Sequence, residues 1–87
     1  MDGERETEAV LPLSEAPAGR EFLVRQLTAG HRLRAHLAGM GLMAGVTLRV
    51  EQNRGRGPLL LSIRGNRLVL GRGMAAQIGV VTAQGPA

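Results

Sequence analysis

The chain has 87 residues, a formal net charge of +4 at pH 7, no cysteine and a single aromatic residue. This length indicates one small domain, because such a chain buries only about 60% of its unfolded surface and has no material for a second core. The absence of cysteine excludes disulfide bonds and cysteine-ligated zinc or iron–sulfur centres.

The hydropathy pattern disfavours membrane and exported proteins. No apolar run approaches the roughly 18 residues that span a bilayer, so we expect no membrane insertion. The first eight residues are acidic, whereas a signal peptide starts with a basic segment. We therefore expect a cytoplasmic protein.

The charge is distributed unevenly along the chain. After Glu8 the sequence has ten arginines against three glutamates, a net charge of +7. A basic body of this kind indicates affinity for a polyanion, such as nucleic acid, an anionic membrane surface or an acidic protein. Arginines that only solvate exposed faces would give the same count.

The chain divides into one ordered body and two tails. Residues 1–9 are polar and aperiodic and are predicted to form a disordered acidic tail. The domain is expected over residues 10–83, and residues 84–87 form a C-terminal tail.

The body opens with a short proline-containing edge segment and a turn. A strand is predicted over residues 20–28. Phe22 and Val24 alternate correctly in it, but Leu27 is out of phase with them, which predicts a bulge near Arg25.

A helix is predicted over residues 30–40. Leu33, Leu37 and Met40 recur there at the spacing of one helical face. The helix is short, so tertiary packing must hold it.

Gly41 is predicted to end this helix in a left-handed conformation, and Gly45 is a second permissive position before an alternating strand over residues 46–51. Leu42 follows the cap glycine, where a hydrophobic contact back to the helix is expected. Consecutive residues in such a turn rarely point the same way. We therefore assign Leu42 to the core and Met43 to the surface.

The next two strands are predicted over residues 59–64 and 67–70. Gly65 and Asn66 form a two-residue turn between them, with Gly65 as the structural glycine. The expected register places the leucines and the isoleucine on one apolar face. It pairs Arg64 with Arg67, Ile63 with Leu68, Ser62 with Val69 and Leu61 with Leu70.

Residues 52–58 are predicted to form a basic loop, residues 71–77 a turn or single helical turn, and residues 78–82 a closing strand. The whole pattern has five or six short strands, glycine turns and one small helix. It predicts a mainly β fold, a small, partly open β-barrel.

Residues 11–82 resemble the FeoA family, the small cytosolic proteins of bacterial ferrous iron transport, which have an SH3-like barrel. Two positions depart from the family pattern, because His36 and Gly71 each stand where the family usually has arginine. The segments that carry the resemblance are His36-Leu37, Met40-Gly41-Leu42, Gly45 with the strand after it, residues 59–65, 68–71 and 75–80.

The resemblance implies a non-enzymatic adaptor without a cofactor. By family, it would dock on the cytosolic part of the ferrous iron permease FeoB and modulate transport. The residues themselves agree that no catalysis is expected, because Ser14 and Ser62 have no positioned base. For the partner-binding surface we expect exposed Met43, with Arg32, Arg34 and Arg72 at its rim.

Two other binding functions remain open on the sequence. The basic body and its Arg54–Gly57 loop could bind nucleic acid through phosphate contacts, although the lone Phe22 excludes base stacking as the usual mode. The fold pattern would equally match a stand-alone SH3-like domain of an iron-dependent repressor. We expect no specific nucleic-acid partner, and a weak homodimer is left open.

Two remaining patterns are weak signals. His31 and His36 lie about 140° apart around a helix, so they cannot chelate one metal ion together, but each could join an intermolecular site. The two G-x-G-x-x-A stretches, at 39–44 and 71–76, lack the strand–turn–long-helix setting of a dinucleotide site. We interpret them as turn glycines and assign no metal site.

Overall fold

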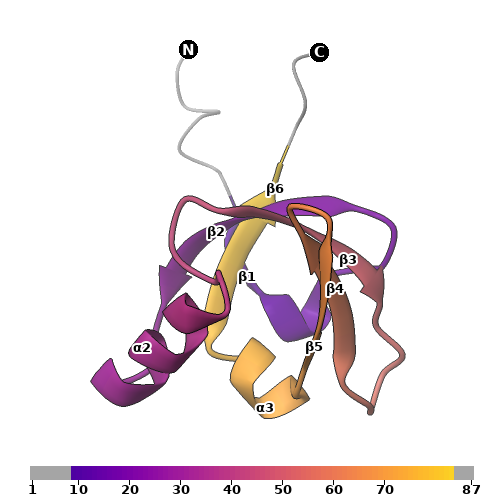
Figure 1. Ribbon diagram of the computed structural model, residues 1–87. Coiled ribbons are helices and arrows are strands. Elements are labelled where there is room, and N and C mark those ends of the chain that lie inside the picture. The colour runs from indigo at the N-terminus through magenta and orange to yellow at the C-terminus, as the bar shows by residue number, and fades with distance from the viewer. Residues whose placement is uncertain (1–8, 84–87) are drawn as a thin grey trace.

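The computed structural model describes residues 9–83, so the tails predicted at 1–9 and 84–87, apart from Ala9, lie outside the described residues. Six antiparallel strands form one sheet, in the order β1-β6-β2-β3-β4-β5, which curls around the core without closing (Figure 1). The predicted partly open barrel with one short helix is confirmed. The elements are β1 (Leu11–Pro12), η1 (Leu13–Glu15), β2 (Glu21–Leu27), α2 (His31–Gly39), β3 (Thr47–Gln52), β4 (Leu59–Ile63), β5 (Asn66–Leu70), α3 (Arg72–Ala75) and β6 (Ile78–Thr82).

The core fills the concave side of the sheet. Alternate residues of the strands point into it, as the period of two predicts, while α2 and α3 lie at the same end of the barrel (Figure 1). No polar or charged residue of the described chain is buried. The largest fully buried side chains are Leu13, Phe22, Val24, Leu37, Leu42, Leu48, Val50, Leu59, Leu61, Leu70, Ile78 and Val80.

The predicted bulge in the first long strand is confirmed. The pairing of β2 with β6 shifts between Val24 and Gln26, which brings Leu27 back into line with Ile78. The edge segment β1 is followed by a 3₁₀ turn that the sequence did not indicate, η1, whose Leu13 is completely buried.

The end of α2 has the predicted left-handed cap. Gly41 has a φ of +90°, the Gly41 N–H donates to the Ala38 carbonyl, and the Leu42 N–H donates to the Leu37 carbonyl, both at 2.9 Å. These two bonds form a Schellman motif, which normally adds a hydrophobic contact between the residue after the cap and the last helical turn. Leu42 and Leu37 are both fully buried, in agreement with that contact.

The turn between β4 and β5 differs from the prediction. Its two central residues are Arg64 and Gly65, not Gly65 and Asn66, and both have positive φ, 54° and 86°. This is the type I′ combination, whose twist matches that of the flanking strands. The predicted pairs were therefore wrong: Leu61 pairs with Leu68 and Ser62 with Arg67.

Compared with the predicted pairing, β5 is displaced by two residues along β4. A shift of two keeps every side chain on the same face, so the apolar face of the hairpin is the predicted one. Leu59, Leu61, Ile63 and Leu70 are buried. The expected apposition of two arginines does not occur, because Arg64 sits in the turn.

Replacing the cap glycine tests the left-handed position. Gly41→Val should destabilise the fold by about 1–2 kcal/mol, because a side chain is disfavoured at this φ; a Cβ itself would meet nothing closer than Ile63 at 4.0 Å. The matched control is Gly39→Ala, within the same helix and with open space around its Cβ, which should stabilise slightly. Chemical denaturation of both variants measures the difference, and equal stabilities would contradict the cap.

The strained turn gives a second stability prediction. Arg64 is the one non-glycine with positive φ among residues 9–83, and asparagine tolerates this region better. Arg64→Asn should therefore raise the free energy of unfolding by about 0.5–1 kcal/mol. Arg54→Asn, at a position without positive φ, should leave it unchanged, and a loss of stability in Arg64→Asn would contradict the turn assignment.

Candidate functional site

A shallow groove of about 350 Å³ runs between α2, the end of β2 and the loop after α2. We call it the α2 groove. Two alanines of α2, whose side chains are small, line it together with longer side chains. The residues that line it are Leu27, His31, Arg34, Ala35, Ala38, Leu42, Met43 and Ala44.

The Schellman cap decides which hydrophobic side chain is exposed at this groove. Leu42 is fully buried because its N–H is bonded to the last turn of α2. Met43, one residue later, turns outward and is 46% exposed. The predicted division between a core Leu42 and a surface Met43 is confirmed. An exposed methionine offers a flexible, polarisable contact surface.

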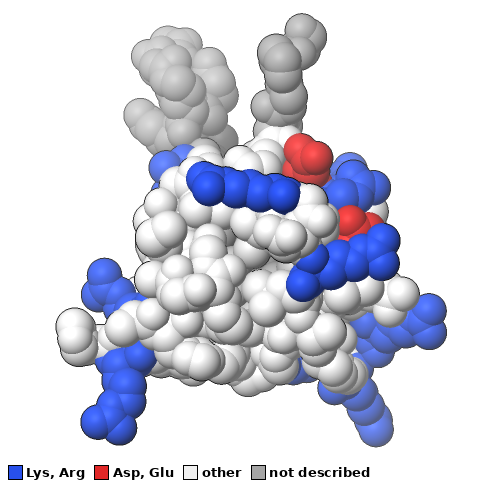
Figure 2. All heavy atoms as spheres, viewed as in Figure 1, with Lys and Arg blue, Asp and Glu red and all other residues white. Residues whose placement is uncertain are grey.

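The helix beside the groove carries positive charge that does not stabilise it. Arg32 and Arg34 lie in or next to its first turn, which has no acidic residue, and Gly30 provides no side-chain cap. Cations at a helix N-terminus oppose the macrodipole. In Figure 2 the acidic side chains gather at the upper right, whereas the basic side chains at the lower left, over α2, have none beside them. This charge is available to an acidic partner.

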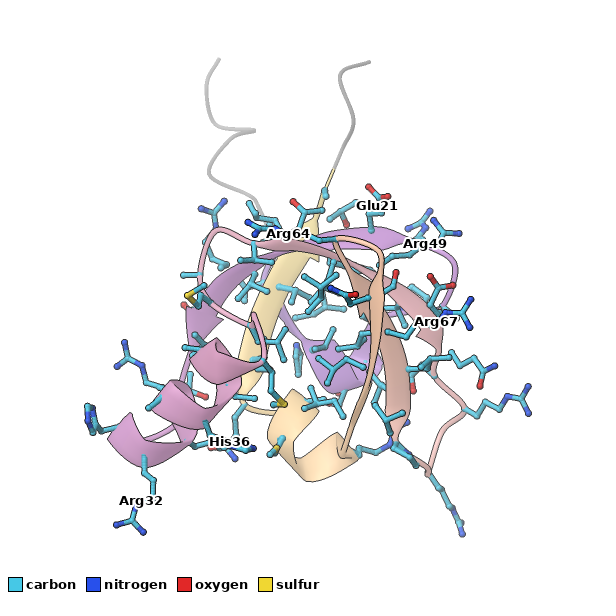
Figure 3. The ribbon with its side chains drawn as sticks, in the orientation of Figure 1. Glu21, Arg32, His36, Arg49, Arg64 and Arg67 are labelled. Atoms are coloured by element: carbon cyan, nitrogen blue, oxygen red, sulfur yellow. The ribbon has the colours of Figure 1, made fainter. Side chains whose placement is uncertain are left out.

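The structure brings together two of the four residues predicted for partner binding. Arg34 and Met43 line the α2 groove. Arg32 borders a neighbouring hollow with Leu33 and His36, and in Figure 3 it points away from the barrel beside His36.

Arg72 lies elsewhere and is occupied within the protein. Its Nε donates to the Gly57 carbonyl at 3.2 Å and its Nη1 to the Ser14 carbonyl at 2.8 Å. Its Nη2 donates to Oδ1 of Asn53. The guanidinium therefore joins α3, η1 and the β3–β4 loop, and we no longer place Arg72 at the rim of the partner surface.

Asn53 completes this polar network and was missed by the sequence analysis. Its Nδ2 donates to the carbonyls of Ser14 and Ala16, at 3.0 and 2.8 Å. Together with Arg72 it satisfies the backbone of η1, which makes no sheet pairing. A lone asparagine in a polar loop carries no signal of such a long-range role.

The histidines and glycine motifs build no recognisable site. Within residues 9–83, no group of three or more His, Cys, Asp or Glu side chains could hold a metal ion. Both histidines are exposed on α2, and Figure 3 places His36 far from Glu21, so one copy cannot join them. The stretch at 39–44 ends a helix, and that at 71–76 contains only the four-residue α3.

Two findings bear on membrane and nucleic-acid binding. No helix in the described part of the chain is long and apolar enough to cross a membrane. Phe22, the only aromatic residue of the sequence, is 1% exposed. Base stacking on an aromatic side chain is therefore unavailable at the surface.

The role of Arg72 can be measured as stability. Arg72→Ala should destabilise the fold by about 1–3 kcal/mol, because it leaves part-buried carbonyls and Asn53 without their charged donor. Arg32→Ala, an exposed arginine on α2, is the control and should change stability by less than about 0.5 kcal/mol. Equal effects in thermal or chemical denaturation would mean that the network contributes nothing.

The fold is that of an SH3-like, partly open barrel, and its surface offers a groove flanked by basic side chains. Residues 11–82 match the family model described as "FeoA domain". The chain belongs to the FeoA family.

Similar proteins agree with this family. The chain is 36% identical over 73 residues to a Methanocaldococcus jannaschii protein provisionally named Fe(2+) transport protein A, covering 84% of this chain and 88% of that protein. A crystal structure of an iron uptake regulatory protein, FeoA, matches with a TM-score of 0.81 and 35% identity over 86% of this chain and all of the other.

A manganese-dependent transcriptional repressor shares the fold. It matches with a TM-score of 0.78 and 23% identity, over 87% of this chain and 43% of the repressor. At this identity the likeness concerns the fold alone. The part of the repressor that matches is less than half of it.

Proposed function

We propose that the protein is a non-enzymatic accessory of ferrous iron transport that docks on the cytosolic part of a FeoB-type permease and modulates uptake. The family supports the transport role. The single observation that supports docking is Met43, held 46% exposed beside the apolar α2 groove by a cap that buries its neighbour. A cytoplasmic location is part of this proposal.

The chemistry of the groove defines the part of the partner that it would accept. Its floor is apolar and its one arginine, Arg34, stands at the edge. An apolar side chain of the permease would enter between Met43 and the alanines of α2. An acidic residue beside it would pair with Arg34 or Arg32, where charge affects the association rate and specificity more than the affinity.

Replacing Met43 with aspartate tests the docking surface. Met43→Asp should weaken binding to detergent-solubilised permease by about tenfold or more, because it puts a charge into an apolar contact. The free energy of unfolding should stay within about 0.5 kcal/mol, since the side chain is exposed. Calorimetry or surface plasmon resonance on the purified proteins measures the first effect and denaturation the second.

The chain offers two matched controls. Val10, 44% exposed and outside the groove, should tolerate Val10→Asp with unchanged permease binding. Leu42→Asp should instead unfold the domain, because it buries an unpaired charge. Full permease binding by Met43→Asp, with the fold intact, would refute this docking surface.

A further inference from the structure

The two edges of the sheet are protected very differently. The β1 edge has two residues, one of them Pro12, which has no N–H to offer. The β5 edge has five residues and no proline. Val69 of β5 is 64% exposed, the highest value among the large hydrophobic residues of the described chain. Proteins normally protect an edge of this kind from pairing with another chain.

The backbone groups that face this open edge follow from the pairing pattern. The Val50 N–H donates to the Arg20 carbonyl at 3.0 Å, so Val50 points its backbone toward β2 and its neighbour Arg49 toward β4. Backbone direction alternates along each strand. Through the pairs Arg49–Ser62 and Leu61–Leu68, the alternation directs Leu68 to β4. Arg67 and Val69 therefore present their N–H and C=O groups outward.

A hollow lies beside the turn end of this edge. Its volume is about 370 Å³, and it separates the end of α2 from the β4–β5 hairpin. Met40 lines one side of it, and Ile63 and Leu68 line the other, so its floor is apolar. Together with the outward backbone of Arg67 and Val69, this hollow forms what we call the β5 edge site.

The rim of the site is basic. Arg64 and Arg67 both line the hollow, and within residues 9–83 no carboxylate forms an ion pair with either. Glu51, on β3, accepts from Ser62 at 3.0 Å and lies 3.7 Å from Arg49. Figure 3 shows Arg64 at the top of the hairpin, and Arg49 and Arg67 pointing away from the sheet on the same side.

These features define the chemistry of the occupant. Residues opposite each other on paired strands share a face, so an added strand would place one residue beside Arg67 and another, two positions along, beside Val69. The first is best acidic and the second apolar. A second copy of this chain fits poorly, because pairing two β5 edges would gather Arg64 and Arg67 of both copies along one seam.

We propose that the β5 edge site binds an extended segment of a partner protein, in which an acidic and an apolar residue lie two positions apart, as a seventh strand of the sheet. Main-chain hydrogen bonds to Arg67 and Val69 supply affinity, and the arginines select the acidic residue. This surface is separate from the α2 groove and does not depend on the docking proposed there.

The probe is an eight-residue peptide of Val with Glu at positions 3 and 7, so that Glu and Val lie two positions apart on one face. N-methyl groups along one edge prevent it from pairing with itself. A matched peptide has Lys in place of Glu. With the full chain labelled for NMR, the Glu peptide should shift the amide signals of β5 and slow amide exchange at Arg67 and Val69. The Lys peptide should bind at least tenfold more weakly.

Two variants make the test specific. Val69→Pro removes an N–H that β4 does not use, so the fold should remain while binding of the Glu peptide falls at least tenfold. Arg67→Glu, at an exposed position, should reverse the preference toward the Lys peptide. Met43→Asp should leave peptide binding unchanged, which separates this site from the α2 groove.

Several results would overturn the proposal. One is binding that is unaffected by both β5 variants, and another is a set of shifts confined to the α2 groove. Concentration-dependent protection of Val69 without peptide would identify a second copy of the chain as the occupant. If Val69→Pro unfolds the protein, its N–H belongs to the sheet and the edge is not open.

Discussion

The hydrogen bond from the Leu42 N–H to the Leu37 carbonyl is the constraint on which the rest of this structure depends. It can form because Gly41 adopts a φ of +90°, which L side chains disfavour. The bond stops α2, draws Leu42 into the core and turns Met43 outward. One local event therefore closes the helix, fills the end of the barrel and creates the groove that we assign to a partner.

A hydrogen-bond network stabilises the open part of the barrel. The sheet does not close, and η1 makes no strand pairing that would satisfy its backbone. Arg72 and Asn53 supply the missing donors to the carbonyls of this turn. The network uses an arginine whose planar guanidinium can serve several acceptors at once. It explains why one basic residue of this surface belongs to the architecture rather than to binding.

Other arginines lie around two separate apolar hollows, Arg34 of α2 at one and Arg64 and Arg67 of the β4–β5 hairpin at the other. Those of α2 oppose the helix dipole, and Arg64 occupies a strained turn position. Neither arrangement stabilises the fold by itself. Local departures from favourable electrostatics or backbone geometry occur mostly at functional sites. Both hollows would favour partners that combine acidic and apolar residues, one beside a helix and the other along a sheet edge.

The sequence by itself determined the elements that depend on neighbouring residues. Periodicity located the helix and strands, the glycines at 41 and 45 marked left-handed positions, and one phase break located the β2 bulge. It also separated Leu42 from Met43, because a helix cap is a local motif.

Tertiary structure alone decided what depends on residues far apart in the chain. The type I′ turn at Arg64 depends on the twist of both strands, which outweighed the glycine-first turn that local preference suggested. Arg72 contacts Ser14, which is 58 positions away in the sequence, and no periodic pattern in the sequence predicts this contact. The open β5 edge follows from strand order, and strand order is settled only when the sheet assembles.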